Sequence, residues 1–121
     1  MTYKTADCDD SPADCGHIRK LLSQWAQLRG LSIHTETFPS AESFLFRYAE
    51  DKTFDLLLLD IEMGAMDGVE LAKRVRKDSE TVQIIFITGY SDYIAEGYEV
   101  AALHYLLKPV SREKLFSVLD R

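Results

Sequence analysis

Polar side chains stand directly after four apolar stretches of this sequence, and their types could perform phosphoryl transfer. An acidic pair, Asp9-Asp10, follows the first stretch, and Asp60, Thr88 and Lys108 follow three later ones. An ionised carboxylate such as that of Asp60 can act as a nucleophile toward phosphorus. Carboxylates gathered around it would repel one another unless cations lay between them. Oxygen ligands at a partly hydrated site suit Mg²⁺, with Mn²⁺ as the alternative.

The two remaining residues suit the same chemistry. Lys108 supplies a second cation, and the hydroxyl of Thr88 could donate to an oxygen of the transferring group, where charge develops in a loose transition state. Taken singly, these residues have plainer explanations, because Asp9-Asp10 could cap a helix and Thr88 or Lys108 could be an ordinary strand or surface residue. Their combination, in this order and at strand ends, favours the site.

A parallel α/β sheet would bring these positions together, because the carboxyl ends of its strands meet at one crevice. Strand-like and helix-like patterns alternate along the chain, with about five of each. Residues 54–59 and 82–87 are nearly continuous in apolar side chains, as in central strands, whereas residues 31–38 alternate, as in an exposed edge strand. We therefore predict an α/β, flavodoxin-like (βα)5 fold, doubly wound, with five parallel strands in the order 2-1-3-4-5.

Capping signals mark where the helices begin and end. Ser11-Pro12 is expected to begin the first helix, with Asp14 in capping-box spacing, and Gly30 is expected to end it. The later helices are expected to begin at Ser40, Gly68, Tyr90-Ser91 and Ser111.

The composition excludes several classes of protein. A chain of 121 residues with 46% hydrophobic and 28% charged residues is typical of one globular domain. Its net charge of -6 and the lack of a basic stripe argue against direct contact with nucleic acid. No apolar stretch is long enough to cross a membrane and no signal peptide follows Met1, so we expect a cytoplasmic protein without membrane contact. Cys8 and Cys15 lack the spacing of a metal or redox motif and are expected to be reduced thiols.

The motifs resemble those of bacterial response-regulator receiver domains over essentially the whole chain, so residues 1–121 are expected to be one receiver domain without its effector domain. The stretch from Gly89 to Pro109 also resembles receivers that precede LytTR-type DNA-binding domains. The matching motifs are CDD (8–10), LLLLDIEM (56–63), MDG (66–68), FIT (86–88) and YLLKP (105–109).

This resemblance implies that Asp60 is the phosphoacceptor, taking a phosphoryl group from a phosphohistidine on a sensor histidine kinase. It implies that Asp10 and Asp60 ligate Mg²⁺ directly, that Asp9 acts mainly through bound water, and that the backbone carbonyl of Glu62 completes the protein ligands. Lys108 would pair with Asp60 and later with the acyl phosphate.

The resemblance also implies a conformational switch rather than an enzyme. Thr88 would move toward the phosphoryl group and Tyr105 would follow it inward, which would re-form the surface made by the fourth helix, the fifth strand and the fifth helix. That surface would control a DNA-binding output domain, with homodimer formation on phosphorylation. The backbone at Glu62 and Tyr90 should rim the site, so both residues are expected to modulate hydrolysis of the phosphoaspartate.

Three residues depart from the usual pattern of these receivers. Ser11 follows the acidic pair where an acidic residue is frequent, but it remains an adequate helix cap. Gly64 stands where they commonly have proline, so the loop after the acceptor should be less restrained. Asp7 stands inside the first strand at a position that is normally apolar. A buried, unpaired carboxylate there would lower stability unless it were protonated or paired, and a role in supporting cation binding is the alternative.

Two other functions compete with the receiver. A small phosphatase of the haloacid-dehalogenase kind resembles this site in its nucleophilic Asp, Thr, Lys, acidic pair and Mg²⁺, but its nucleophile comes first in the chain and its acidic pair last. Here Asp9-Asp10 comes first, and Glu62 stands where the phosphatases have a second Asp. A binding module independent of phosphorylation is the other alternative, and the intact Asp60 and Lys108 argue against it.

Overall fold

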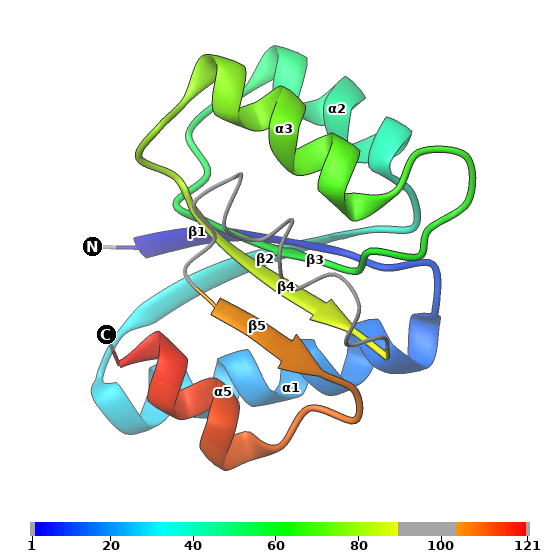
Figure 1. Ribbon diagram of the computed structural model, residues 1–121. Helices are drawn as coiled ribbons and strands as arrows, with labels where there is room; N and C mark the ends of the chain where they lie inside the picture. The colour runs from blue at the N-terminus through cyan, green and yellow to red at the C-terminus, as the bar shows by residue number, and fades with distance from the viewer. Residues whose placement is uncertain (1, 90–103, 121) are drawn as a thin grey trace.

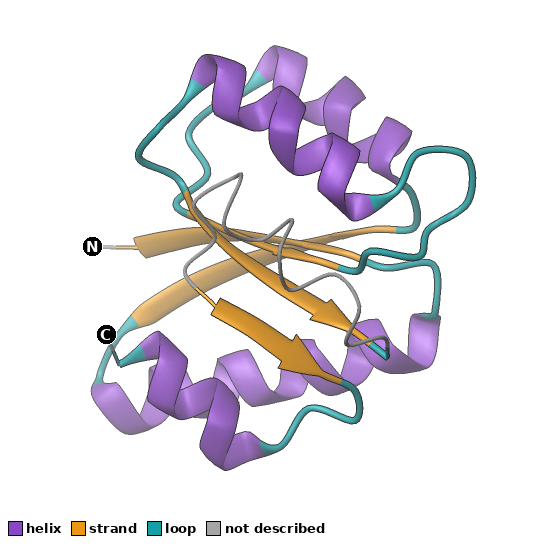
Figure 2. Ribbon diagram, viewed as in Figure 1, coloured by secondary structure: helices purple, strands orange, loops and turns teal. Residues whose placement is uncertain are grey.

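Five parallel strands form one sheet in the computed structural model, which describes residues 2–89 and 104–120 (Figures 1 and 2). The strand order is β2-β1-β3-β4-β5, and each pair of neighbours runs parallel. This order confirms the predicted doubly wound α/β fold. The strands are β1 (Thr2–Cys8), β2 (Ser32–Phe38), β3 (Leu56–Leu59), β4 (Gln83–Thr88) and β5 (His104–Leu107).

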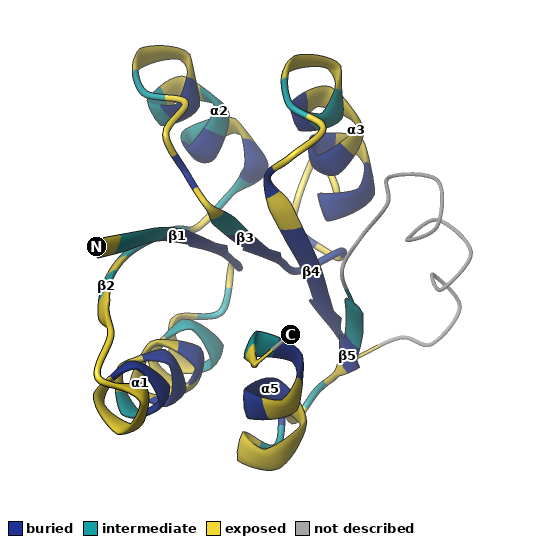
Figure 3. Ribbon diagram, turned by 90° about the vertical axis from the view of Figure 1, so that its left-hand side faces the viewer, coloured by how far each residue is buried: buried dark blue, intermediate teal, exposed yellow. Residues whose placement is uncertain are grey.

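Helices cover both faces of the sheet, as the alternating pattern requires. Helices α2 and α3 lie on one face, and α1 and α5 lie on the other (Figures 1 and 3). The expected fourth helix falls on residues 90–103, which lie outside the described part of the chain. The described helices are α1 (Pro12–Arg29), α2 (Ala41–Glu50), α3 (Gly68–Asp78) and α5 (Arg112–Leu119).

The capping signals place the helix ends correctly, with one exception in detail. The hydroxyl of Ser11 accepts a hydrogen bond from the backbone N–H of Asp14 at 3.3 Å, and Gly30 ends α1 in the left-handed conformation at φ 67°. The other hydrogen bond of the expected capping box, from the backbone N–H of Ser11 to the Asp14 side chain, is not formed. The backbone N–H of Ser11 donates to Oδ1 of Asp9 at 2.9 Å instead, because Asp9 lies only two residues away. Ser40 and Ser111 cap α2 and α5 as expected.

The core is divided by the sheet into two layers, and this division explains the continuous apolar stretches. Successive side chains of a strand point to opposite faces, so a central strand must be apolar at every position. In β3, Leu57 and Leu59 pack on the side of α2 and α3, whereas Leu58 packs on the side of α1 and α5. All three are fully buried, and each such side chain contributes roughly 1.5–3 kcal/mol. No residue of β2 is fully buried, as expected for an edge strand.

The start of α3 lies unusually close to the end of β3. The backbone N–H of Gly68 donates to the carbonyl oxygen of Ile61 at 2.9 Å. A Cβ atom at Gly68 would overlap the carbonyl oxygen of Asp60 and lie 2.9 Å from its carbonyl carbon. Glycine is therefore required there for steric reasons, and it fixes the loop that follows Asp60.

We expect Gly68→Ala to lower the free energy of unfolding by about 1–3 kcal/mol, because backbone atoms cannot swing away from the added methyl group as a side chain could. The urea midpoint measures this effect. Gly16→Ala is the matched control: Gly16 is exposed within α1, its Cβ would meet nothing within 4 Å, and alanine there should raise stability by about 0.5–1 kcal/mol. Equal midpoints for Gly68→Ala and the wild type would contradict the argument.

Candidate functional site

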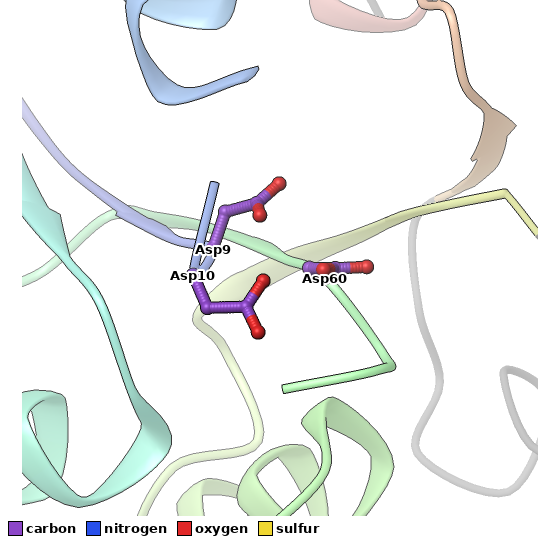
Figure 4. A group of neighbouring side chains, drawn as sticks. All are labelled: Asp9, Asp10 and Asp60. Atoms are coloured by element: carbon purple, nitrogen blue, oxygen red, sulfur yellow. The ribbon is translucent and has the colours of Figure 1, made fainter. Parts of the chain in front are cut away.

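Three carboxylates meet where β1 and β3 end (Figure 4). One oxygen from each of Asp9, Asp10 and Asp60 lies within 4.8 Å of the other two. The two strands pair in parallel, and the backbone N–H of Asp60 donates to the carbonyl oxygen of Cys8 at 2.9 Å, which sets the acidic residues side by side. Asp9 and Asp60 are buried, with 5% and 6% of their surface exposed, whereas Asp10 is exposed. The expected convergence of these residues is confirmed.

Lys108 reaches this acidic cluster from the end of β5. Its backbone N–H donates to the carbonyl oxygen of Thr88 at 2.8 Å, which holds it beside the end of β4. Its Nζ atom lies 2.8 Å from Oδ2 of Asp9 and 3.4 Å from Oδ2 of Asp60. It also lies 2.8 Å from Oδ2 of Asp14, in the first turn of α1. The expected pair with Asp60 is thus present, but it is the longest of the three that Lys108 forms with described residues.

Asp14 is a site residue that sequence reasoning missed. Its position three residues after Ser11 indicated a capping role, and 94 residues separate it from Lys108. Only the packing of α1 beside the end of β5 brings the two charges together. No spacing rule along the chain could have revealed this contact.

The charges of this site perturb one another strongly. Burial, followed by the neighbouring charge of Asp9, raises the pKa of Asp60 to about 6, although Lys108 opposes the shift. Burial disfavours the charge of Lys108, yet its hydrogen bonds to Asp14 and Asp9 and the charge of Asp60 outweigh this and raise its pKa. The hydrogen bond from Lys108 lowers the pKa of Asp14. One ammonium group therefore compensates several carboxylates only in part.

The donor set fits a hard divalent cation. Asp9, Asp10 and Asp60 offer only oxygen ligands, which Mg²⁺ prefers, and the exposed Asp10 leaves the crevice open to the waters that Mg²⁺ retains. The raised pKa of Asp60 also fits a cation site, because the charged form of Asp60 lacks full compensation and an added cation would favour it.

Glu62, whose backbone carbonyl is the expected fourth ligand, lies in the loop between β3 and α3 with an exposed side chain. In that loop Gly64 adopts the left-handed conformation at φ 63°.

The expected switch residues lie on neighbouring strands. Thr88 is the last residue of β4 and is fully buried, and its register partner in β5 is Leu107. Tyr105 pairs with Phe86 in register, is half-buried, and packs against the core layer beneath α2 and α3. Tyr90, expected to modulate hydrolysis, lies outside the described residues.

Asp7 is buried as the strand pattern predicted, with 3% of its surface exposed. Its Oδ2 atom has no hydrogen-bond partner among residues 2–89 and 104–120. Burial, followed by the charge of Asp9, raises the pKa of Asp7 to about 7, although a hydrogen bond with Cys15 opposes the shift. Cys8 and Cys15 are free thiols, as expected. The Asp7 carboxyl group beneath the acidic cluster is therefore only partly compensated.

Replacing Asp7 by an apolar residue is expected to stabilise the protein at neutral pH. Asp7→Val, close in volume, and Asp7→Ile should raise the free energy of unfolding by about 1–3 kcal/mol, because a buried polar group without full compensation costs this much. Asp7→Asn should gain less, since it removes the charge but keeps a buried polar group. Chemical denaturation measures the three variants, and no rise for either Asp7→Val or Asp7→Ile would overturn the burial argument.

Comparison with known proteins decides the family. The family model of the response regulator receiver domain matches residues 8–120. The chain belongs to this family. An uncharacterised response regulatory protein of Vibrio cholerae is 34% identical to this receiver domain over 124 residues, which cover 100% of the chain and 45% of that relative. The family match favours the receiver over the phosphatase that shares its residue types.

Further relatives agree with the resemblance to LytTR-type regulators. The sensory transduction protein LytT of Bacillus subtilis is 37% identical to the receiver domain over 71 residues, which cover 59% of the chain and 30% of LytT. The expected similarity to LytTR-type regulators is confirmed. The chain spans less than half the length of the curated relatives that it matches.

Solved structures confirm the architecture of the receiver domain. The chemotaxis protein CheY4 of Vibrio cholerae superposes with a TM-score of 0.76 at 28% identity, over 100% of this chain and 98% of CheY4. The fold is thus CheY-like. Among the described helices, none combines the length and the apolar character needed to cross a membrane.

Proposed function

We propose that this receiver domain is a phosphorylation switch in which Asp60 accepts a phosphoryl group from a phosphohistidine of a sensor histidine kinase. A carboxylate oxygen of Asp60 would form the new bond to phosphorus as the bond from phosphorus to the imidazole nitrogen breaks, and the imidazole would leave with the bonding electron pair. The observation that carries the proposal is the juxtaposition of a buried Asp60 with two further carboxylates and an ammonium group 3.4 Å away.

Asp9, Asp10 and Asp60, with the backbone carbonyl of Glu62, would hold Mg²⁺, or Mn²⁺ in its place. When bound, the ion would neutralise charge on the phosphoryl oxygens. Lys108 would pair with the acyl phosphate after transfer, and the hydroxyl of Thr88 would donate to one of its oxygens.

The output would be a shift between two conformations of this domain. Thr88 and Tyr105 would couple the phosphoryl group to the surface of the fourth helix, β5 and α5, and that surface would control a DNA-binding output domain elsewhere in the protein. Homodimer formation on phosphorylation fits this mode of control. We also propose a cytoplasmic location, no membrane contact, and no direct contact between this domain and nucleic acid, which its net charge of -6 supports.

Glu62 and Tyr90 are proposed to modulate hydrolysis of the phosphoaspartate, because their positions in the chain, two residues after Asp60 and Thr88, should place their backbone at the rim of the site. Glu62→Ala and Tyr90→Ala are each expected to change the half-life of the phosphorylated protein. Loss of the phosphoryl group, followed by intact-mass measurement, reports this half-life. Half-lives equal to that of the wild type would remove both residues from the proposal.

Intact-mass measurement tests the proposed function directly. The wild type, incubated with acetyl phosphate or phosphoramidate and Mg²⁺, is expected to gain one phosphoryl group, and a chelator should prevent the gain. A protein that bound its partners independently of phosphorylation would gain none. A phosphatase would instead turn over a generic phosphate ester many times.

A further inference from the structure

The strongest feature left unused by the proposed function is the ion pair between Lys108 and Asp14. Asp14 is not one of the three clustered carboxylates, and it projects from the first turn of α1. Its Oδ2 atom lies 2.8 Å from Nζ of Lys108, as close as that of Asp9 and closer than that of Asp60 at 3.4 Å. Within the described part of the chain, the ammonium group therefore stands nearest to two carboxylates that are not the proposed acceptor.

The local structure of α1 leaves the Asp14 carboxylate available for this pair. The backbone N–H of Ser11, which a capping box would assign to the Asp14 side chain, is occupied by Oδ1 of Asp9 at 2.9 Å. The backbone N–H of Asp14 meanwhile donates to the Ser11 hydroxyl at 3.3 Å, which fixes the first turn. The backbone N–H groups of Ser11 and Asp14 are thus both satisfied without the Asp14 carboxylate, whose Oδ2 atom pairs with Lys108.

We propose that Asp14 is a positioning residue that draws Lys108 away from Asp60. This inference rests on the proposed function and names a regulatory contact of the same site. By sharing the ammonium group, Asp14 leaves Asp9 and Asp60 less compensated, which favours a divalent cation between them. The same sharing weakens the contact of Lys108 with a phosphoryl group on Asp60.

Two effects of opposite sign follow from removing this charge. In Asp14→Asn, which keeps the shape of the side chain, Lys108 keeps its pairs with Asp9 and Asp60 among the described residues and loses the one that competes with them, so Mg²⁺ should bind more weakly. A phosphoryl analogue on Asp60 should bind more tightly once Mg²⁺ is saturating, because Lys108 can approach it. Because 44% of the Asp14 side chain is exposed, solvent screens the pair, and each change should be roughly two- to five-fold.

Titration calorimetry of the full chain with Mg²⁺, and then with beryllofluoride at saturating Mg²⁺, measures both changes. The matched control is Glu113→Gln, which removes a negative charge from the first turn of α5, outside the ion pairs that Lys108 makes in the described part of the chain. Both affinities of this control should stay close to those of the wild type.

A double-mutant cycle with Lys108→Met separates positioning from a general charge effect. If Asp14 acts through Lys108, Asp14→Asn should change neither affinity by more than a small factor when Lys108 is already methionine. The proposal is overturned if the two affinities change in the same direction, if neither changes, or if the full effect persists without Lys108. The proposed function fails separately, through a wild type that binds Mg²⁺ but gains no phosphoryl group.

Discussion

The Asp60→Ala variant is expected to gain no phosphoryl group from acetyl phosphate and Mg²⁺ under conditions that label the wild type. The acceptor must be a carboxylate that faces both the cation site and an ammonium group. Asp9 is also buried beside Lys108, but its Oδ1 atom accepts a hydrogen bond from the backbone of Ser11 and its Oδ2 atom pairs with Lys108 at 2.8 Å. Both oxygens of Asp9 are thus engaged, so it should not replace Asp60.

The control for this variant is the carboxylate at the opposite end of the same strand. Asp55 directly precedes β3, is exposed, and accepts a hydrogen bond from the backbone of Lys4 at 2.8 Å, so Asp55→Ala should be labelled like the wild type. Without metal, Asp60→Ala should be at least as stable as the wild type. Burial and the charge of Asp9 raise the pKa of Asp60 to about 6, and replacing Asp60 removes the repulsion between the two carboxylates. A labelled Asp60→Ala protein would refute the assignment.

The Lys108→Met variant is expected to lose stability in metal-free solution and to regain part of it with Mg²⁺. Methionine keeps the apolar stem but removes the only charge that pairs with both buried carboxylates, Asp9 and Asp60, among the residues that the structure describes. Removing one partner of a buried ion pair costs about 3–5 kcal/mol, and the 23% exposure of Lys108 places its loss at the lower end. A divalent cation that binds the folded protein adds stability by mass action. Because Lys108→Met leaves Asp9 and Asp60 without their ammonium partner, the cation should bind this variant more tightly, and the unfolding midpoint should depend on Mg²⁺ more steeply than in the wild type.

Lys52→Met is the control for this second experiment. Lys52 pairs with Asp78 at 2.9 Å, but about half of each side chain is exposed, so its loss should cost at most about 1 kcal/mol and respond little to Mg²⁺. Thermal or urea unfolding with and without Mg²⁺ compares the two variants. If Lys108→Met and Lys52→Met lost equal stability, the ammonium group would not be compensating the buried cluster.

Much of the fold could be predicted because local patterns and the global fold agree. A central parallel strand is covered on both faces, so the unbroken apolar stretch of β3 indicated its place. The caps at Ser11, Ser40 and Ser111 depend on side chains that reach only three residues along the chain, which is why spacing alone located them. The acidic cluster was predictable for a topological reason, since the carboxyl ends of parallel strands converge.

The tertiary structure alone decided how the charges are shared. Sequence order placed Lys108 near Asp60, but the distances of 2.8, 2.8 and 3.4 Å depend on how α1 packs against the end of β5. Asp14 seemed a helix cap by spacing and is an ion-pair partner in the fold. The spacing of apolar residues along the sequence encodes which face of a helix or strand is buried, because backbone geometry fixes how often a side chain returns to the same face. Coulomb contacts between distant elements depend on fractions of an ångström in packing, and a linear pattern does not carry that information.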